Sequence, residues 1–318
     1  MKQLLLKTLY VLARIRYPKY RGDLGYFVRD NWFARLSQIR FFGRDYITKK
    51  PYKVIEFQGE FDQEIRYVMP FAYWHHLNGT LKQTISCTNT KPFYFFSENH
   101  EERHTQRVWQ TAYGNYSAPN MTHAPAFDFS KWAPLPYKTH YRNDRFVYDK
   151  PLLVIANKYN VEWDKAPINF LSINALDRLI TSLKARYQIV YNRPLGGQIV
   201  LDNSEIMDLG EHAWIRANHP EVLLMNDLFD QHRDAVSNFN HLQLMVYANC
   251  DRFISMHGGT AALASQFGGI NVILSHPGGG WEHAFNEYET IFPAMSGAKI
   301  LHARKLDEVF GFVNEHFL

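Results

Sequence analysis

The run Phe253–Met256 is followed directly by His257, Gly258, Gly259 and Thr260, where an expected strand passes into an expected helix. Glycines let a phosphate approach the backbone closely, and the first N–H groups of a helix attract negative charge. Thr260 can cap that helix or bond a phosphate oxygen. We therefore predict an anion-binding turn in which His257 contacts a phosphate or a sugar. The alternative is a tight structural turn whose histidine is already hydrogen-bonded.

A second polar group follows the expected strand Leu152–Ala156, in the order Asn157, Lys158 and Tyr159. A lysine ammonium at this position could neutralise a diphosphate, and a tyrosine ring could stack on a nucleotide base. Trp163, a few residues later, is an alternative stacking side chain. Because exposed lysines are common on loops, a purely structural loop remains an alternative.

Arg193 ends the expected strand Gln188–Tyr191. Its planar guanidinium suits bidentate recognition of a phosphate, although a structural ion pair with Glu205 or Asp202 is equally compatible with the sequence. Further along, a glycine run at 278–280 precedes Glu287 and suggests a mobile lid or a close backbone approach. Glu287 is a candidate acceptor for ribose hydroxyls, or a solvated helix residue.

In the N-terminal half, Glu60 and Asp62 lie between an expected strand and an expected helix. If the two halves face each other, either carboxylate could take a proton from an acceptor hydroxyl. Asp62 is equally well explained as an acidic residue near a helix N-terminus. His75 and His76 are alternative bases.

The periodicity of the chain indicates elements that would position these residues. In the N-terminal half it predicts strands Lys53–Phe57, Leu81–Cys87 and Phe93–Phe96, with a helix Phe61–Leu77 that Pro70 should kink or bound. In the C-terminal half, strands alternate with helices. The expected strands there are Leu152–Ala156, Gln188–Tyr191, Gln198–Leu201, Val222–Met225, Phe253–Met256, Val272–Leu274 and Lys299–His302, and the helices are Ile173–Arg186, Asn240–Ala248 and Leu306–His316.

This alternation predicts an α/β protein whose C-terminal half is a doubly wound parallel sheet. In such sheets, ligands bind at the carboxyl ends of the strands, which is where the residues above stand. A length of 318 residues fits two domains. We place an N-terminal α/β domain at 1–145 and a C-terminal, ligand-binding domain at 146–318.

Several signatures are absent from the sequence. There is no Asp-x-Asp, no Gly-x-x-x-x-Gly-Lys-Ser/Thr phosphate loop, no Gly-x-Gly-x-x-Gly near the first strand of either half and no Gly-x-Ser-x-Gly. Kinase, dinucleotide-dehydrogenase and hydrolase functions thereby lose most of their support. The two cysteines cannot form a disulfide framework or a Cys-based zinc site, which favours a reducing compartment.

Positive charge is concentrated at the N-terminus. The first 50 residues hold 12 Lys/Arg and 3 Asp/Glu, whereas the whole chain has a net charge of only +4, so the remainder is net negative. This distribution argues against a general nucleic-acid binder. No apolar run approaches the roughly 20 residues of a transmembrane helix.

Residues 1–21 carry an amphipathic pattern. Leu5, Leu9, Leu12 and Ile15 share a helical face among basic residues. This pattern predicts a helix on an anionic membrane surface, or one packed on its own domain. Residues 22–50 show no clear periodicity, so they receive no assignment.

The C-terminal half resembles two-domain glycosyltransferases of the GT-B architecture. The stretch from Asn238 through Thr260, with its helix, strand and His-Gly turn, looks most like the family-61-type group, and the Gly268-Gly269 pair before a strand is similar as well. The resemblance implies two Rossmann-like domains facing a cleft, with a nucleotide-sugar donor on the C-terminal domain, an acceptor on the N-terminal domain and no cofactor or metal. By motif position, donor-binding roles fall on His257, Gly258, Gly259 and Arg193. A second glycine and Thr260 depart from the group's pattern.

Residues and resemblance together predict a metal-independent glycosyltransferase of polysaccharide biosynthesis. It would be cytoplasmic, peripheral on the membrane inner face, and would transfer a sugar to a glycan or a lipid-linked glycan. A nucleotide-sugar epimerase of the same fold and a non-catalytic membrane-peripheral scaffold are the alternatives.

Overall fold

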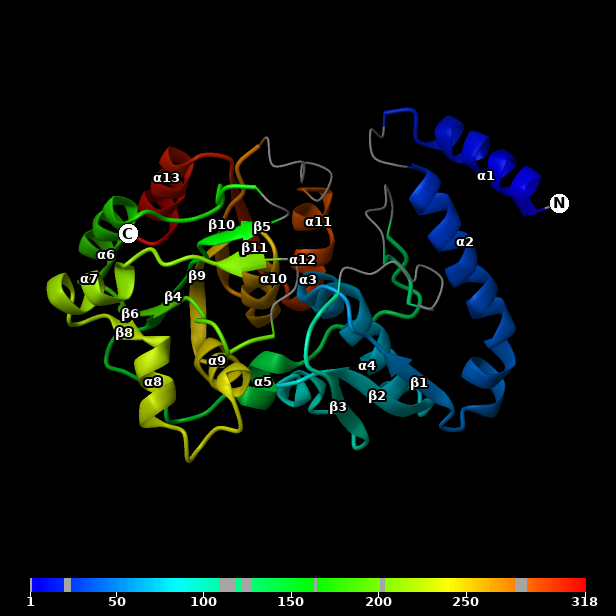
Figure 1. Ribbon diagram of the computed structural model, residues 1–318, viewed down its shortest axis with the longest axis horizontal. Helices are drawn as coiled ribbons and strands as arrows, with labels where there is room; N and C mark the ends of the chain where they lie inside the picture. The colour runs from blue at the N-terminus through cyan, green and yellow to red at the C-terminus, as the bar shows by residue number, and fades with distance from the viewer. Residues whose placement is uncertain are drawn as a thin grey trace.

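The computed structural model describes residues 2–19, 24–108, 118–121, 127–162, 165–200, 204–277 and 285–318. Its N-terminal helices are α1 (Lys2–Arg16) and α2 (Leu24–Arg40), followed by the π-helical turn η1 (Gly43–Thr48). Figure 1 shows α1 and α2 along one edge of the molecule, with α2 running beside the N-terminal sheet. The helix predicted within residues 1–21 is thus present, and much of the unassigned segment after it is also helical.

The N-terminal half contains a three-stranded parallel sheet of β1 (Lys53–Glu56), β2 (Leu81–Cys87) and β3 (His100–His104), in the order β1-β2-β3. The connection from β1 to β2 is one helical segment made of α3 (Phe61–Gln63), η2 (Glu64–Val68) and α4 (Met69–Leu77). The middle part, η2, is π-helical and ends just before Pro70, which stands in the first turn of α4. A proline has no N–H to donate, so a widened turn before it keeps the segment helical.

The strand predicted at Phe93–Phe96 is wrong. This stretch belongs to the 3₁₀ helix η3 (Lys91–Tyr94) and the turn after it, and the third strand is β3. Phe93 and Tyr94 are both fully buried, so the short apolar run reflects burial on all sides and not the alternation of a strand. A short helix, α5 (Tyr137–Tyr141), lies in the connection to the second half.

The C-terminal half is built on a six-stranded parallel sheet. Its strands are β4 (Leu152–Ala156), β6 (Gln188–Asn192), β8 (Leu223–Leu224), β9 (Cys250–Met256), β10 (Ile270–Leu274) and β11 (Lys299–Ala303). Their spatial order is β11-β10-β9-β4-β6-β8, with every neighbouring pair parallel. If these six strands are renumbered 1 to 6 in chain order, their spatial order from the β8 edge is 3-2-1-4-5-6. This is the doubly wound arrangement that the sequence predicted.

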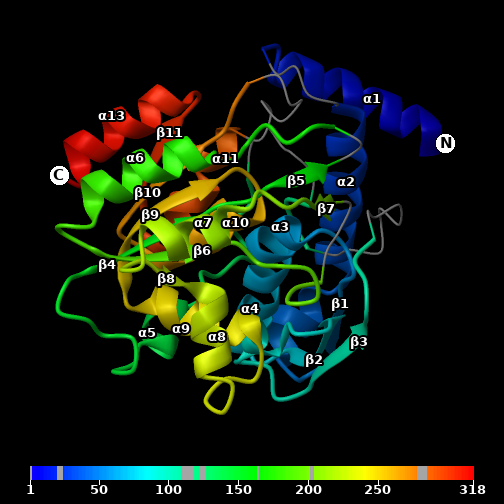
Figure 2. The ribbon, with the colours of Figure 1, turned by 60° about the vertical axis from the view of Figure 1, so that its left-hand side comes forward.

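Helices cover both faces of this sheet. The described helices of this half are α6 (Ile173–Leu183), α7 (Glu211–Asn218), α8 (Met225–Gln231), α9 (Phe239–Ala248), α10 (Gly259–Ala264), the 3₁₀ helix η4 (Ser265–Phe267), α11 (Phe285–Glu289), α12 (Ile291–Ser296) and α13 (Leu306–His316). Figure 2 shows α6 and α13 side by side on one face. Leu153 and Ile155 of β4 belong to the core on that face, while Val154 and Ala156 belong to the core on the other. Burial on both faces explains why β4 is apolar throughout.

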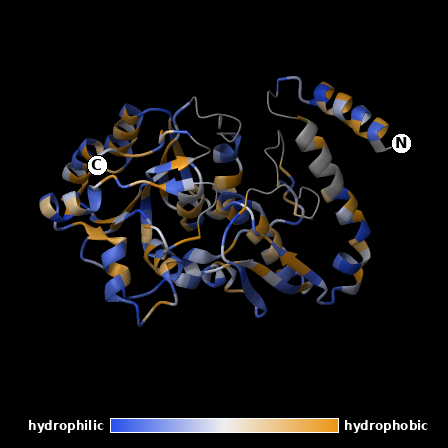
Figure 3. Ribbon diagram, viewed as in Figure 1, coloured by the Kyte–Doolittle hydropathy of each residue, from blue (hydrophilic) through white to orange (hydrophobic). Residues whose placement is uncertain are grey.

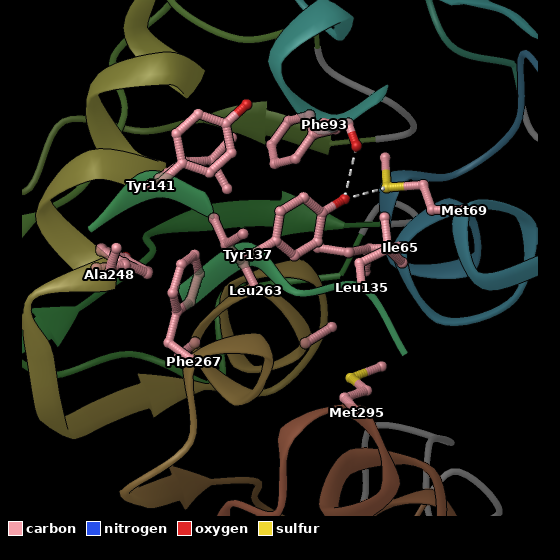
Figure 4. Close-up of a cluster of buried hydrophobic side chains, with 14 of the residues drawn as sticks. Ile65, Met69, Phe93, Leu135, Tyr137, Tyr141, Ala248, Leu263, Phe267 and Met295 are labelled. Atoms are coloured by element: carbon pink, nitrogen blue, oxygen red, sulfur yellow. Dashed lines mark hydrogen bonds between the residues drawn. The ribbon is translucent and has the colours of Figure 1, made fainter. Parts of the chain in front are cut away.

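One hydrophobic core joins the two halves. It contains Ile65 and Met69 of the N-terminal helical segment together with Leu263 and Phe267 of the C-terminal half. Figure 4 shows Tyr137 of α5 among these side chains, where its hydroxyl donates to the carbonyl of Phe93 at 2.9 Å. The shared core fixes the two halves against each other.

The structure differs from the sequence predictions in two further places. The stretch predicted as a strand from Gln198 contributes only an isolated bridge at Ile199, and it ends at Leu201, outside the described residues. A short antiparallel pair, β5 (Asn160–Glu162) with β7 (Ser204–Ile206), was not predicted. These strands have only three residues each, too few for a periodic signal to emerge.

Candidate functional site

The carboxyl ends of β4 and β9 lie side by side at the centre of the six-stranded sheet. The chain order reverses between these two strands, and ligands of doubly wound folds bind outside that point. Lys158 follows β4 and Gly258 follows β9. The Lys158 Nζ lies 3.7 Å from the position that a Cβ on residue 258 would occupy. The structure thus brings the two predicted groups together at the place where the fold favours a ligand.

The turn after β9 depends on a glycine. Gly258 has φ 98° and ψ −146°, a conformation that other residues rarely adopt, and it caps α10. The first N–H groups of α10 have no acceptor within the helix, which suits them to an anion. The Thr260 hydroxyl, however, donates to the carbonyl of Met256, so it ties the start of α10 to the end of β9 and does not cap the helix. Its predicted contact with a phosphate stays a prediction.

His257 is held through one ring nitrogen. Its Nδ1 contacts the hydroxyl of Tyr288 and lies 3.0 Å from the Ser275 Oγ. Burial raises the pKa of Tyr288 well above its ordinary value, so this hydroxyl stays protonated. The sequence did not single out Tyr288 or Ser275 as site residues. The signal available for Ser275 was its position directly after β10, the strand next to β9.

Arg193 lies in a buried ion pair. Its Nε and Nη2 bind the two carboxylate oxygens of Glu211, and its Nη1 donates to the carbonyl of Met207 at 3.1 Å. Among the described residues the partner is Glu211 and not Glu205, and both side chains of this pair are at most 3% exposed, while Asp202 falls outside the described residues. This geometry favours the structural alternative, and the phosphate-binding role of Arg193 remains an untested prediction.

Asn157 and Tyr159 stabilise the loop that follows β4. The Asn157 side chain is fully buried and bonds the backbone of Leu171 at both its oxygen and its nitrogen, at 2.9 and 3.0 Å. Tyr159 packs its ring against Phe170, with centroids 4.8 Å apart. These contacts anchor the loop that carries Lys158. They account for both residues without a ligand, so their donor-binding roles also remain predictions.

Glu287 faces the N-terminal half. Its carboxylate is buried in an ion pair with Arg66 of η2 and accepts from the Tyr67 hydroxyl at 2.5 Å. Arg66 also forms an ion pair with Asp62, so one guanidinium binds two carboxylates. The side chains of Arg66, Asp62 and Glu287 together carry one net negative charge. A solvated position for Glu287 is therefore wrong. Contact with a ribose would need this buried pair to rearrange.

Glu60 and Asp62 lie at the boundary between the halves. Phe61, which stands between them, packs so closely on α10 that a Cβ on Gly259 would come within 3.0 Å of its ring. One oxygen of Asp62 binds Arg66, while its Oδ1 is buried and has no hydrogen-bond partner among the described residues. The structure thus places the segment that carries both predicted carboxylates against the start of α10.

A neighbouring carboxylate, Glu64, is occupied by the protein itself. It accepts hydrogen bonds from Ser86, from Tyr94 at 2.7 Å and from Arg107 at 2.7 Å. Arg107 also donates to the carbonyl of Gly59 at 2.7 Å and so fixes the loop before Glu60. Glu64 is therefore a structural centre of the N-terminal half.

The remaining candidates lie elsewhere or outside the described residues. His75 is buried beside Asp45 and Thr80, under η1. The glycine run at 278–280 and Trp163 fall outside the described residues. Among the residues that the structure describes, no group of three or more His, Cys, Asp or Glu is arranged to hold a metal ion. Metal independence remains a prediction.

Comparison with known proteins gives a fold but no family. No family model and no curated protein sequence matches the chain. Among solved structures, E. coli ADP-heptose LPS heptosyltransferase II is similar over 84% of this chain and 100% of its own, with 10% identity and a TM-score of 0.50. E. coli heptosyltransferase WaaC with ADP-2-deoxy-2-fluoro heptose matches over 90% and 80%, with 11% identity and a TM-score of 0.40. A family 9 glycosyl transferase from Veillonella parvula matches over 93% and 72%, with 12% identity and a TM-score of 0.34.

The last two matches have TM-scores below 0.5 and carry no weight. The match to heptosyltransferase II extends over the whole of that enzyme and shows a shared architecture. The chain therefore has the two-domain α/β fold of GT-B glycosyltransferases, as the resemblance implied. The finer likeness to the family-61-type group finds no support among these structures and stays a prediction.

Proposed function

We propose that this protein is a glycosyltransferase that uses a nucleotide-sugar donor. The observation that carries the proposal is the meeting of Lys158 and the Gly258 turn at the topological switch point of a GT-B fold. A lysine ammonium and the helix N–H groups there would stabilise the diphosphate as it leaves, because preorganised donors act where negative charge develops. His257, held by Tyr288, would contact the same diphosphate or the sugar.

The acceptor would approach from the N-terminal half. In the transfer step, the bond between the anomeric carbon and the diphosphate breaks, and a bond from the acceptor oxygen forms. The acceptor proton passes to a carboxylate, for which Asp62 is the better candidate because its Oδ1 has no hydrogen-bond partner among the described residues. Glu60 is the second candidate. The reaction so drawn requires no metal.

The donor nucleotide is tested first with ADP, because the matched E. coli enzyme is described as an ADP-heptose transferase. For the acceptor we propose a glycan or a lipid-linked glycan at the cytoplasmic face of a membrane. In α1, five exposed apolar side chains support this location: Leu4, Leu5, Val11, Leu12 and Ile15. On a helix that turns 100° per residue, these five side chains form one stripe. Lys7 and Arg14 lie along one side of the stripe, and Arg16 lies along the other. Leu9, which the sequence grouped with them, lies on the half-buried side.

The experiment that tests the donor site is nucleotide binding by calorimetry and thermal shift, with ADP, UDP, GDP and CMP, each with and without a chelator. We expect one nucleotide to bind, and Lys158→Met to raise its Kd about 10- to 100-fold, as loss of a charge-assisted hydrogen bond does. The matched control is Lys299→Met, at the exposed amino-terminal end of the edge strand β11, away from the carboxyl ends of the strands. Unchanged affinity in Lys158→Met would refute the donor site.

Activity separates the proposal from its alternatives. With the matching nucleotide sugar, a transferase needs an acceptor for product, whereas an epimerase converts the donor alone. Asp62→Asn should bind nucleotide normally and lose transfer. A folded protein that binds none of the nucleotides at millimolar concentration would be a scaffold.

A further inference from the structure

A second exposed apolar stripe follows α1 along the chain, at the end of α2 and in η1. It consists of Leu36, Ile39, Phe42, Tyr46 and Ile47, whose side chains are between 42% and 77% exposed. The short spacing between successive members places them along one side of the helical segment. The rings of Phe42 and Tyr46 contact each other, with centroids 4.9 Å apart. Figure 3 shows the mixture of apolar and polar residues in this region.

The stripe is held rigidly on the body of the protein. Asp45, in the middle of η1, is buried where its neighbours are exposed. Its carboxylate accepts from the Tyr52 hydroxyl at 2.5 Å and forms an ion pair with Lys131, and its backbone carbonyl accepts from Asn78 at 2.7 Å. Tyr46 packs edge-on against Trp74. The apolar side chains are therefore presented outward by a fixed turn.

The stretch of chain that carries the stripe is basic, although Asp128 of another segment lies near Tyr46. Between residues 34 and 50 the exposed charged residues are all basic, namely Arg35, Arg40, Arg44, Lys49 and Lys50. The acidic residue of this stretch is Asp45, which is buried and paired. Apolar side chains bordered by five cations match the interface of an anionic bilayer, where acyl chains lie below phosphate headgroups. A second copy of the chain would bring its own five cations against them, which disfavours self-association through this face.

We propose that the α2–η1 stripe is a second membrane-contacting surface, with Ile39, Phe42 and Ile47 inserted at the headgroup boundary of an anionic bilayer. No described helix is long and apolar enough to span a membrane. Such contact would therefore lie in the interface.

The second surface would give the protein a defined orientation on the membrane. α2 has 17 residues, which corresponds to about 25 Å between the α1 end and η1. Contact through α1 alone leaves the body able to swing about one helix. Contact at two places this far apart restricts that rotation, and Figure 1 shows both segments at the same edge of the molecule. This inference extends the membrane location proposed above and does not depend on the transferase reaction.

The test is flotation of the full chain with two kinds of vesicle, one of phosphatidylcholine alone and one of phosphatidylcholine mixed with anionic phosphatidylglycerol. The variant Ile39→Ser/Ile47→Ser removes the two most exposed apolar residues of the stripe, and Leu4→Ser/Ile15→Ser weakens the α1 stripe. The matched control is Val147→Ser/Leu318→Ser, which removes exposed apolar side chains far along the chain. Circular dichroism melts establish that each variant is folded.

We expect the parent to bind anionic vesicles, and Ile39→Ser/Ile47→Ser to lower its partition coefficient roughly tenfold or more, because each apolar side chain contributes separately to insertion. The control should bind vesicles as the parent does. Leu4→Ser/Ile15→Ser should keep a part of the binding that a variant with all four substitutions, at 4, 15, 39 and 47, loses. Three results would overturn the inference: no effect of Ile39→Ser/Ile47→Ser on flotation, equal binding to neutral vesicles, or a dimer in sedimentation that this variant dissociates.

Discussion

His75 should make the stability of the protein depend on pH between 5 and 7.5. Its ring is buried, with Nδ1 2.7 Å from the Thr80 Oγ1, while Nε2 has no hydrogen-bond partner among the described residues. Burial, and then the nearby positive charge of Lys53, lower the pKa of His75 to about 3. In the unfolded chain a histidine titrates near its ordinary value of about 6.5. Between these values the unfolded chain binds a proton that the folded protein does not bind.

The sign and size of the effect follow from proton linkage. Because the unfolded state binds more protons, the free energy of unfolding falls as pH falls below about 6.5. At pH 5 the pH lies about 1.5 units below the unfolded pKa, and each unit corresponds to about 1.4 kcal/mol. His75 should therefore cost about 2 kcal/mol of stability at pH 5 and almost nothing at pH 7.5.

The measurement is urea unfolding, followed by tryptophan fluorescence, of the parent and His75→Gln at both pH values. Glutamine keeps a polar side chain but does not titrate, so the cost of the substitution itself cancels between the two pH values. On going from pH 7.5 to pH 5, the free energy of unfolding should fall by about 2 kcal/mol more in the parent than in the variant. An equal fall in both proteins would show that His75 is solvated or charged in the folded state, contrary to this reasoning.

Two substitutions, each beside a control, test the junction between the halves and the turn after β9. Glu287→Gln should lower the free energy of unfolding by about 3 kcal/mol, because it breaks a buried ion pair with Arg66, whereas Asp227→Asn, which breaks an exposed pair, should cost under about 1 kcal/mol in the same urea titration. Gly258→Ala should cost about 1–3 kcal/mol in backbone strain and weaken nucleotide binding in calorimetry. Gly197→Ala, at a φ of +84° with open space around it, should cost a similar amount and leave binding unchanged; equal affinities in both variants would contradict the placement of the phosphate.

The C-terminal fold was predictable because its strands carry strong local signals. Leu152–Ala156 is apolar at every position, and Phe253–Met256 ends at a glycine turn, so both strands were placed correctly to within a few residues. The N-terminal half was harder. At Phe93–Phe96 the apolar run belongs to a 3₁₀ helix and the turn after it, and only the tertiary core distinguishes that from a buried strand.

The site was predictable in its location but only partly in its contacts. The rule that ligands bind at the carboxyl ends of parallel strands was enough to group Lys158 with the turn after β9. The pairing of Arg193 with Glu211 joins residues 18 positions apart, across a stretch that includes the short strand β7, and no periodic pattern indicates it. The pairing of Glu287 with Arg66 joins the two halves of the chain, and no local pattern in the sequence indicates it.

That long-range pairing has a consequence for the site as a whole. Glu287 and Tyr288 are consecutive residues of α11, and they contact different parts of the protein. Glu287 binds Arg66 and Tyr67 of the N-terminal half, while Tyr288 holds the Nδ1 of His257. Through two adjacent residues, α11 therefore connects the buried ion pair between the halves to the hydroxyl that holds His257.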